Sequence, residues 1–160
     1  MKILITGSNG QLGNELQKII STGTAEIGAV SNTIKTAEVF AVDVDKLDIT
    51  NLEQVKTVLK EVNPDVVINC AAATNVDGCE ANKDLAFKIN ALGARNLAMV
   101  CEEIGAKIVQ VSTDYVFRGV GDTPLNEADI VAPVSSYGKT KLLGEEFVRD
   151  FSSKYYIMIN

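Results

Sequence analysis

The segment over residues 2–13, KILITGSNGQLG, constrains the fold more than any other part of this chain. Aliphatic and β-branched residues run into a glycine-rich turn and then into helical periodicity, which predicts a buried strand, a tight turn and a helix start. In such a unit Gly7 lets the chain turn, Gly10 lets backbone N–H groups approach a diphosphate, and Gly13 lets the helix pack close to the strand. The spacing is GxxGxxG rather than the commoner GxGxxG, so a plain strand-to-helix corner is the alternative.

The composition excludes several classes of protein. At 160 residues the chain is long enough for one domain over 1–160 with its own core. The absence of histidine rules out Ser-His-Asp and Cys-His catalysis and the common histidine-containing metal sites, so we expect no metal centre. A net charge of −6 argues against a nucleic-acid surface, and no segment reads as a membrane span or secretion signal. Three cysteines at unrelated spacings suit a reducing cytoplasm.

Strand and helix signals alternate along the chain. Helices are predicted over 11–20, 51–62, 81–104 and 136–151. Strands are predicted over 3–6, 38–42, 65–69, 107–111 and 155–159. The polar stretches 24–37 and 118–133 are interpreted as surface loops, with a short strand over 25–31 as the alternative in the first. Right-handed crossovers between such strands build a doubly wound parallel sheet, so the predicted fold class is α/β of the NAD(P)-binding Rossmann type.

Two further signals refine this arrangement. The helix over 51–62 is preceded by Thr50, which begins the capping-box pattern S/T-x-x-E. Asp43 follows the strand over 38–42, where a Rossmann unit has an acidic residue that binds the adenosine ribose. Its distance from the glycines exceeds the usual ~20 residues, so a solvated strand end fits equally well. If Asp43 contacts the ribose, it would disfavour the 2′-phosphate of NADPH. Because that contact is itself one of two alternatives, the choice between NADH and NADPH stays open.

Tyr137 and Lys141 carry the candidate chemistry. They lie four residues apart in the helix over 136–151 and hence on one helix face. A nearby ammonium lowers the pKa of a phenol, so Tyr137 could donate a proton to a carbonyl that is being reduced. Thr113, at the end of the strand over 107–111, faces the same crevice and could bind that carbonyl. Taken alone, Y-x-x-x-K is more often an exposed helical pair.

With these residues in place, the chain resembles the N-terminal part of the extended short-chain dehydrogenases/reductases. The matching segments are GSNGQLG at 7–13, LDIT at 47–50, AAATNVDGCE at 71–80, STDYVF at 112–117 and YGKTKLLGE at 137–145. The resemblance is greatest to members that reduce the 4-keto group of dTDP-4-dehydro-6-deoxy-L-mannose with NADPH or NADH, giving dTDP-L-rhamnose for cell-surface polysaccharide. It therefore implies an NAD(P)-dependent oxidoreductase with a dTDP-sugar substrate, and it is compatible with a homodimer.

The resemblance also implies roles for single residues. Thr113, Tyr137 and Lys141 match the catalytic trio. The positions that match the cofactor site, together with Asp43 from the strand pattern, are Gly7, Gly10, Gln11, Leu12, Gly13, Asp48, Ile49, Ala71, Ala72 and Asn90. The positions that match the sugar-nucleotide site are Thr74, Val76, Asp77, Tyr115 and Phe117. For these secondary positions ordinary turn or core packing is the alternative, above all for Phe117.

One departure from the family pattern leaves other functions open. The family has a smaller C-terminal region that closes over the sugar-nucleotide, and this sequence ends at Asn160 without it. We therefore expect a cofactor domain with half of a substrate pocket. A sugar-nucleotide epimerase or dehydratase and a non-catalytic nucleotide-binding regulatory module both fit the same fold. The Thr/Tyr/Lys trio favours catalysis, whereas the absent region favours binding alone.

Overall fold

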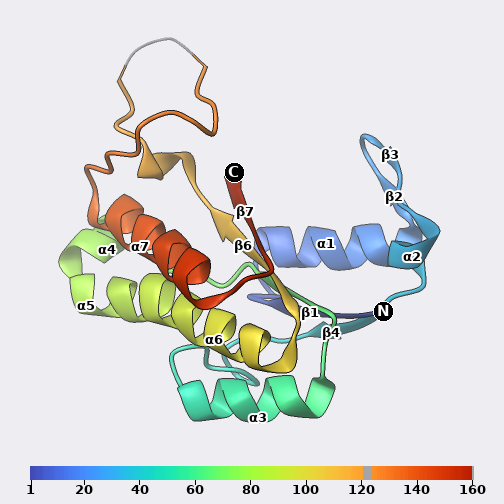
Figure 1. Cartoon of the computed structure of the whole chain (residues 1–160). Helices are drawn as coiled ribbons and strands as arrows, with labels where there is room; N and C mark the ends of the chain where they lie inside the picture. Colours follow the sequence, from blue (N-terminus) through green and yellow to red (C-terminus); the bar gives the residue numbers. More distant parts are fainter. Residues whose placement is uncertain (121–123, 160) are drawn as a thin grey trace.

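A computed structural model of the chain describes residues 1–120 and 124–159 (Figure 1). The elements are, in chain order, β1 (Lys2–Thr6), α1 (Gln11–Thr22), β2 (Thr24–Ala25), β3 (Gly28–Ala29), α2 (Asn32–Lys35), β4 (Glu38–Ala41), α3 (Leu52–Val62), β5 (Val66–Asn69), α4 (Val76–Ala81), α5 (Lys83–Ala86), the π-helical segment η1 (Phe87–Gly93), α6 (Ala94–Ile104), β6 (Lys107–Ser112), the 3-10 segment η2 (Asp114–Val116), α7 (Ser136–Phe151) and β7 (Tyr155–Ile159).

Five strands form one sheet in the order β4-β1-β5-β6-β7, and every neighbouring pair is parallel. The predicted doubly wound parallel sheet is therefore confirmed. The chain moves from β1 to β4 on one side and then returns to β5 on the other, so the strand order reverses at β1. In open α/β sheets, ligands bind at such a reversal, beyond the carboxyl ends of the strands.

The core consists of two hydrophobic layers, one on each face of the sheet. Leu4 and Val67 belong to the layer that packs against α3, α6 and α7, whereas Ile3 and Ile5 pack against Ile20 of α1. Successive residues of a strand point to opposite faces, which is why neighbouring residues of β1 supply both layers. Figure 1 shows α1 on one side of the sheet and α3, α6 and α7 on the other.

The helix predicted over 81–104 differs from the structure at its beginning. Residues 76–81 form the separate short helix α4, and Asn82 breaks the chain with φ −136° and ψ 77°. The Asn82 side chain then accepts a hydrogen bond from the Leu85 N–H at 3.1 Å and caps the next helix. From Lys83 the chain is helical to Ile104, but with a π-helical turn over Phe87–Gly93 that hydrophobic periodicity does not reveal.

Two further local predictions need correction. The capping residue of α3 is Asn51, whose side chain accepts from the Gln54 N–H at 3.2 Å, rather than Thr50. Thr50 instead donates to the side chain of Asp48 at 2.7 Å, which removes its hydroxyl from the helix. The segment over 24–37 is not a plain loop, because it contains the two-stranded β2–β3 hairpin and the short helix α2.

The C-terminal third matches its predicted elements closely. Helix α7 and strand β7 have the predicted bounds, and β6 extends one residue further, to Ser112. The predicted loop over 118–133 lies partly outside the described residues, and its described part contains neither helix nor strand. In the described chain, no helix combines the length and the apolar character that crossing a membrane requires.

Candidate active site

The glycine turn after β1 is built by close backbone contacts. Gly7 has a φ of +61°, and a Cβ atom there would lie 2.7 Å from the backbone of Ala71. A Cβ atom on Gly13 would collide with the carbonyl oxygen of Gly7 and lie 2.7 Å from the Cα of Ser8. Any side chain at either position would therefore push the turn away from β5 or from α1.

The start of α1 is suited to hold an anion. Among the described residues, no side chain caps this helix end, and its capping position is Gly10. The first amide N–H groups of a helix have no partner within the helix and carry partial positive charge. Gly10, Gln11, Leu12 and Gly13 all line the adjoining cleft. The cradle therefore fits the diphosphate of a dinucleotide, as the sequence predicts.

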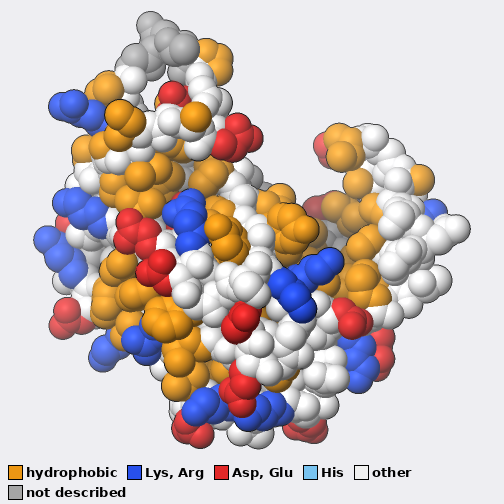
Figure 2. Space-filling model, in the orientation of Figure 1, with side chains coloured by type: hydrophobic (Ala, Val, Ile, Leu, Met, Phe, Trp, Pro, Cys, Tyr) orange, Lys and Arg blue, Asp and Glu red, His pale blue; other side chains and the backbone are white. Residues whose placement is uncertain are grey.

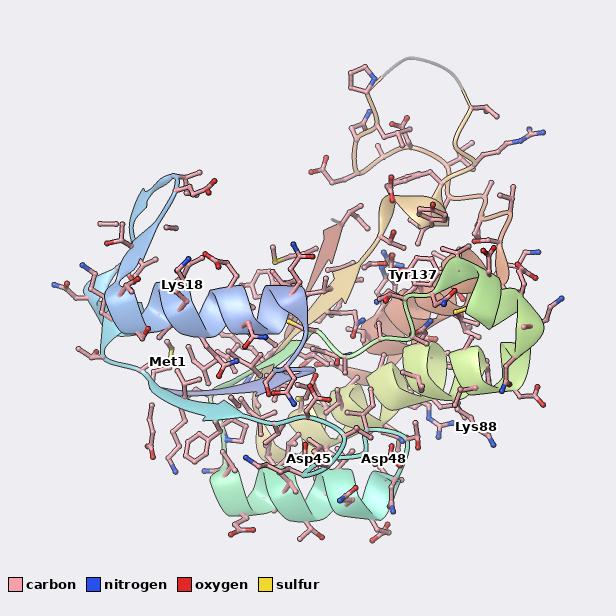
Figure 3. The ribbon with its side chains drawn as sticks, turned by 180° about the vertical axis from the view of Figure 1, so that it is seen from behind. Met1, Lys18, Asp45, Asp48, Lys88 and Tyr137 are labelled. Atoms are coloured by element: carbon pink, nitrogen blue, oxygen red, sulfur yellow. The ribbon has the colours of Figure 1, made fainter. Side chains whose placement is uncertain are left out.

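A cleft of about 1090 Å³ extends from this turn along the carboxyl edge of the sheet. It is lined by three groups of residues: those around the glycine turn, those that follow β4, and those at the ends of β5 and β6 with the start of α7. Predicted site residues among them are Gly7, Gly10, Gln11, Leu12, Gly13, Asp43, Asp48, Ile49, Ala71, Ala72, Thr74, Thr113, Tyr137 and Lys141. Figure 3 shows Tyr137 beside α4 and Asp48 in the loop before α3.

Asp43 connects the end of β4 to the glycine turn. Its Oδ2 atom accepts a hydrogen bond from the Asn9 N–H at 2.9 Å, and its Oδ1 atom accepts from the Val44 N–H at 2.8 Å. The carboxylate thus fixes the loop that faces the anion cradle. It also lines the cleft, so the position is compatible with the predicted ribose contact as well as with a structural role.

The loop that carries Asp48 and Ile49 is held in place by hydrogen bonds from α6. The buried Asn96 side chain donates to the carbonyl oxygens of Ile49 and Thr50 at 3.0 and 3.2 Å. Asp48 accepts from both the N–H and the hydroxyl of Thr50. Asn96 is a residue that the sequence analysis missed, because a polar side chain on an otherwise apolar helix gives no sign of the loop that it meets.

Thr113, Tyr137 and Lys141 come together at the other end of the cleft. Thr113 follows β6, is 6% exposed, and accepts a hydrogen bond from the Tyr115 N–H at 3.3 Å. Ser135 caps α7 by accepting from the Gly138 N–H at 3.0 Å, so Tyr137 falls in the first turn. The ring of Tyr115 packs edge-on against Tyr137, with centroids 5.5 Å apart.

Lys141 is almost completely buried, with 3% of its surface exposed. Its Nζ atom donates a hydrogen bond to the carbonyl oxygen of Val111 at 2.6 Å. Burial lowers the pKa of Lys141 from its ordinary 10.5 to about 8, and the charge of Glu145 counteracts only part of this effect. The side chain therefore titrates only slightly above neutral pH.

The expected effect of Lys141 on the pKa of Tyr137 is not found in this structure. Burial raises the pKa of Tyr137, and only the side chain of Thr113 lowers it. Lys141 is turned toward the Val111 carbonyl, which explains why its charge does not act on the phenol. The tyrosine hydroxyl therefore stays protonated at neutral pH, as a proton donor must be.

Five predicted site residues lie outside the cleft: Val76, Asp77, Asn90, Tyr115 and Phe117. Val76 packs against the buried cluster that contains Tyr137, and Asp77 is exposed in the first turn of α4. Asn90, in the π-helical turn, accepts from the Ala73 N–H at 2.8 Å and donates to the Ala73 carbonyl and the Thr140 hydroxyl, each at 3.1 Å. It therefore joins the loop after β5 to α7.

Two glutamates near the site have contacts that the sequence analysis did not anticipate. Glu80 accepts hydrogen bonds from the backbone N–H and the hydroxyl of Ser136, and these bonds lower the pKa of Glu80. Glu145 accepts from the Ser112 hydroxyl at 2.5 Å. Both glutamates end segments quoted for the family resemblance, at 71–80 and 137–145. Their place in those segments was the one sign in the sequence that they matter. Their hydrogen-bond partners could not be predicted, because these partners are distant in sequence.

The face of the molecule shown in Figure 2 has charged side chains of both signs. Acidic and basic side chains are interspersed there, and no broad basic area is visible. Some of these opposite charges form exposed ion pairs, for example Lys60 with Glu103 at 2.6 Å. This distribution agrees with the net charge of −6.

Comparisons with known proteins extend these observations. The chain is 52% identical to a dTDP-4-dehydrorhamnose reductase structure from Clostridium acetobutylicum, with a TM-score of 0.90, covering 99% of this chain and 52% of that one. It is 42% identical to a dTDP-4-dehydrorhamnose reductase from Bacillus anthracis solved in complex with NADP, with a TM-score of 0.87 and coverage of 99% and 52%.

A curated relative, the probable low-salt glycan biosynthesis reductase Agl14 of Haloferax volcanii, is 38% identical over 99% of this chain and 52% of its own length. The chain thus spans about half the length of the relatives it matches. Residues 1–159 match the family model described as the RmlD substrate binding domain. With that match over nearly the whole chain, and with the cleft and its Thr/Tyr/Lys group in place, the chain belongs to the RmlD substrate binding domain family.

Proposed function

We propose that the protein is an NAD(P)H-dependent reductase of the 4-keto group of a dTDP-4-dehydro-6-deoxy sugar. The observation that carries this proposal is the convergence of the anion cradle and of Thr113, Tyr137 and Lys141 on one cleft. The names of the solved relatives and the NADP complex of one of them support the choice of substrate and cofactor. Free thiols at Cys70, Cys79 and Cys101 support a cytoplasmic location.

We assign a separate role in cofactor binding or catalysis to each group of residues in the cleft. The N–H groups at the start of α1 hold the diphosphate, and Ala71 and Ala72 leave space for the nicotinamide end. The cofactor, when bound, supplies a hydride to the carbonyl carbon. Tyr137 donates its hydroxyl proton to the carbonyl oxygen, while the Thr113 hydroxyl orients that oxygen. The Lys141 ammonium, which is turned toward the Val111 carbonyl and away from the phenol, is our candidate for binding the ribose.

We assign the residues that contact the sugar-nucleotide from the lining of the cleft and from side-chain contacts with Tyr137. Thr74 lines the cleft beyond Ala72 and is our candidate for direct contact with the sugar-nucleotide. Tyr115 acts on the site through its ring contact with Tyr137. We place Asp43 near the adenosine ribose. Its negative charge there would disfavour the 2′-phosphate of NADPH and so favour NADH.

The test follows nicotinamide absorbance in a mixture of this chain, NADPH or NADH, and the dTDP-4-keto-6-deoxy sugar. We expect oxidation that requires the sugar, and we expect Tyr137→Phe to reduce kcat by about 10²- to 10⁴-fold while cofactor affinity stays within about twofold. Tyr155→Phe, at a partly exposed position in β7, is the control. Normal turnover by Tyr137→Phe would contradict the assignment. Cofactor binding by folded protein without any sugar-dependent oxidation would replace it with a nucleotide-binding module.

A further inference from the structure

Glu145 is a buried carboxylate beside the site that the proposed reaction does not use. Only 2% of its surface is exposed. Its Oε1 atom accepts a hydrogen bond from the Ser112 hydroxyl at 2.5 Å, and its Oε2 atom accepts from the Arg149 guanidinium at 3.0 Å. Burial of a carboxylate is costly even when it is paired, so a residue of this kind calls for an explanation beyond packing.

The position of Glu145 relates it to two members of the candidate trio. It lies four residues after Lys141 in α7, so both side chains emerge from the same face of the helix. Its partner Ser112 is the last residue of β6 and directly precedes Thr113. Glu145 therefore links the helix that carries Tyr137 and Lys141 to the strand end that carries Thr113.

Lys141 depends on Glu145 for most of its compensating charge. Among the described residues, none of the ion pairs within 4.0 Å includes Lys141, and its Nζ atom has the uncharged Val111 carbonyl as its hydrogen-bond acceptor. The attraction of Glu145 is the largest influence that favours the charged lysine, and Cys70 at the end of β5 adds no charge at neutral pH because burial raises the pKa of its thiol to about 11. Of the other groups nearby, Tyr137 is neutral at physiological pH, and Arg149 forms an ion pair with the Glu145 carboxylate at 3.0 Å.

We propose that Glu145 is a positioning residue whose buried carboxylate keeps Lys141 protonated and, through Ser112, holds the end of β6 that carries Thr113 against α7. The catalytic meaning of this coupling rests on the proposed function, because it requires Lys141 to act as a cation. The coupling itself is a property of two side chains in the folded chain, and it is measurable without turnover.

The test is an NMR titration of the chain with isotopically labelled lysine, in which the Lys141 signal is assigned by its loss in Lys141→Arg. In the native chain we expect a midpoint near the pKa of about 8. Glu145→Gln keeps the size of the side chain but removes its charge, so its midpoint should fall by about one pH unit or more. Glu145→Asp should restore the midpoint toward the native value. Glu146→Gln, an exposed neighbour, should leave it unchanged.

A second variant shifts the midpoint in the opposite direction. Arg149→Gln removes the cation that competes for Glu145, so the Lys141 midpoint should rise. The Arg149 side chain is 45% exposed, and the fold should tolerate this change even if Glu145→Gln fails to fold. A native midpoint in Glu145→Gln, or in Arg149→Gln when only that variant folds, overturns the proposal and leaves Glu145 as a packing residue.

Turnover provides an independent comparison. If the proposed function holds, the alkaline limb of the pH profile of kcat should move in the same direction as the NMR midpoint in each variant. If the chain shows no turnover, the Lys141 midpoint still tests the coupling between Glu145 and Lys141. Failure of the proposed function and failure of this inference therefore give different results.

Discussion

Replacing Lys141 with methionine should make the folded protein more stable while it abolishes turnover. The lysine is 3% exposed and its pKa falls from 10.5 to about 8 in the folded chain. That difference corresponds to a cost of about 3 kcal/mol for keeping the side chain charged at neutral pH. Methionine has a similar volume and no charge, but it loses the hydrogen bond to the Val111 carbonyl, which is worth about 1 kcal/mol. The expected net gain is about 2 kcal/mol at neutral pH.

The pH dependence of this gain identifies its cause. Below about pH 8 the lysine is charged in both the folded and the unfolded chain, so the full cost applies. Between about pH 8 and 10.5 the unfolded chain binds more protons than the folded one, and the stability of the native protein rises with pH. The advantage of Lys141→Met should therefore shrink by about 3 kcal/mol across this window. Thiol titration at Cys101 occurs in both proteins and cancels in the difference, whereas the Cys70 pKa also responds to Lys141 and should rise in Lys141→Met.

The measurement is urea unfolding followed by far-UV circular dichroism at a series of pH values for the native chain, Lys141→Met and Lys139→Met. Lys139 is exposed on the same helix, so its substitution should change the free energy of unfolding little at any pH. A Lys141→Met variant that is less stable than the native chain at neutral pH would refute the reasoning. A stability difference that stays constant between pH 8 and 10.5 would refute it equally.

Two further substitutions test the architecture of the cleft. Gly13→Ala places a methyl group against the carbonyl oxygen of Gly7, so we expect a loss of about 1–3 kcal/mol in urea unfolding and about tenfold weaker NADPH binding in a fluorescence titration; unchanged affinity would argue against the cradle. Asn90→Ala removes three hydrogen bonds to Ala73 and Thr140, which should cost about 2–4 kcal/mol in the same unfolding assay. A variant as stable as the native chain would show that this junction is dispensable.

Local sequence patterns determined the elements and the chemistry at their ends. Strand and helix propensities act over a few residues, and the glycine turn, the bounds of α7 and the strand β7 were predictable for that reason. Parallel strands bring their carboxyl ends to one edge of the sheet, so the fold class alone indicated that Thr113 would approach Tyr137 and Lys141. The predictions that were wrong, such as the cap of α3 and the start of the helix before η1, involve side chains with more than one available partner.

Only the tertiary structure decided what surrounds these residues. The sequence assigned both Asn90 and Asp43 to the cofactor site. In the fold, Asn90 lies outside the cleft and accepts a hydrogen bond from the Ala73 N–H, whereas Asp43 lines the cleft and also accepts a hydrogen bond from the Asn9 N–H. The burial of Lys141 and its proximity to Glu145 set a pKa that no pattern of residue types specifies. Burial, pairing and desolvation depend on segments brought together from distant parts of the chain, and for this reason the electrostatics of the site could not be predicted from the sequence alone.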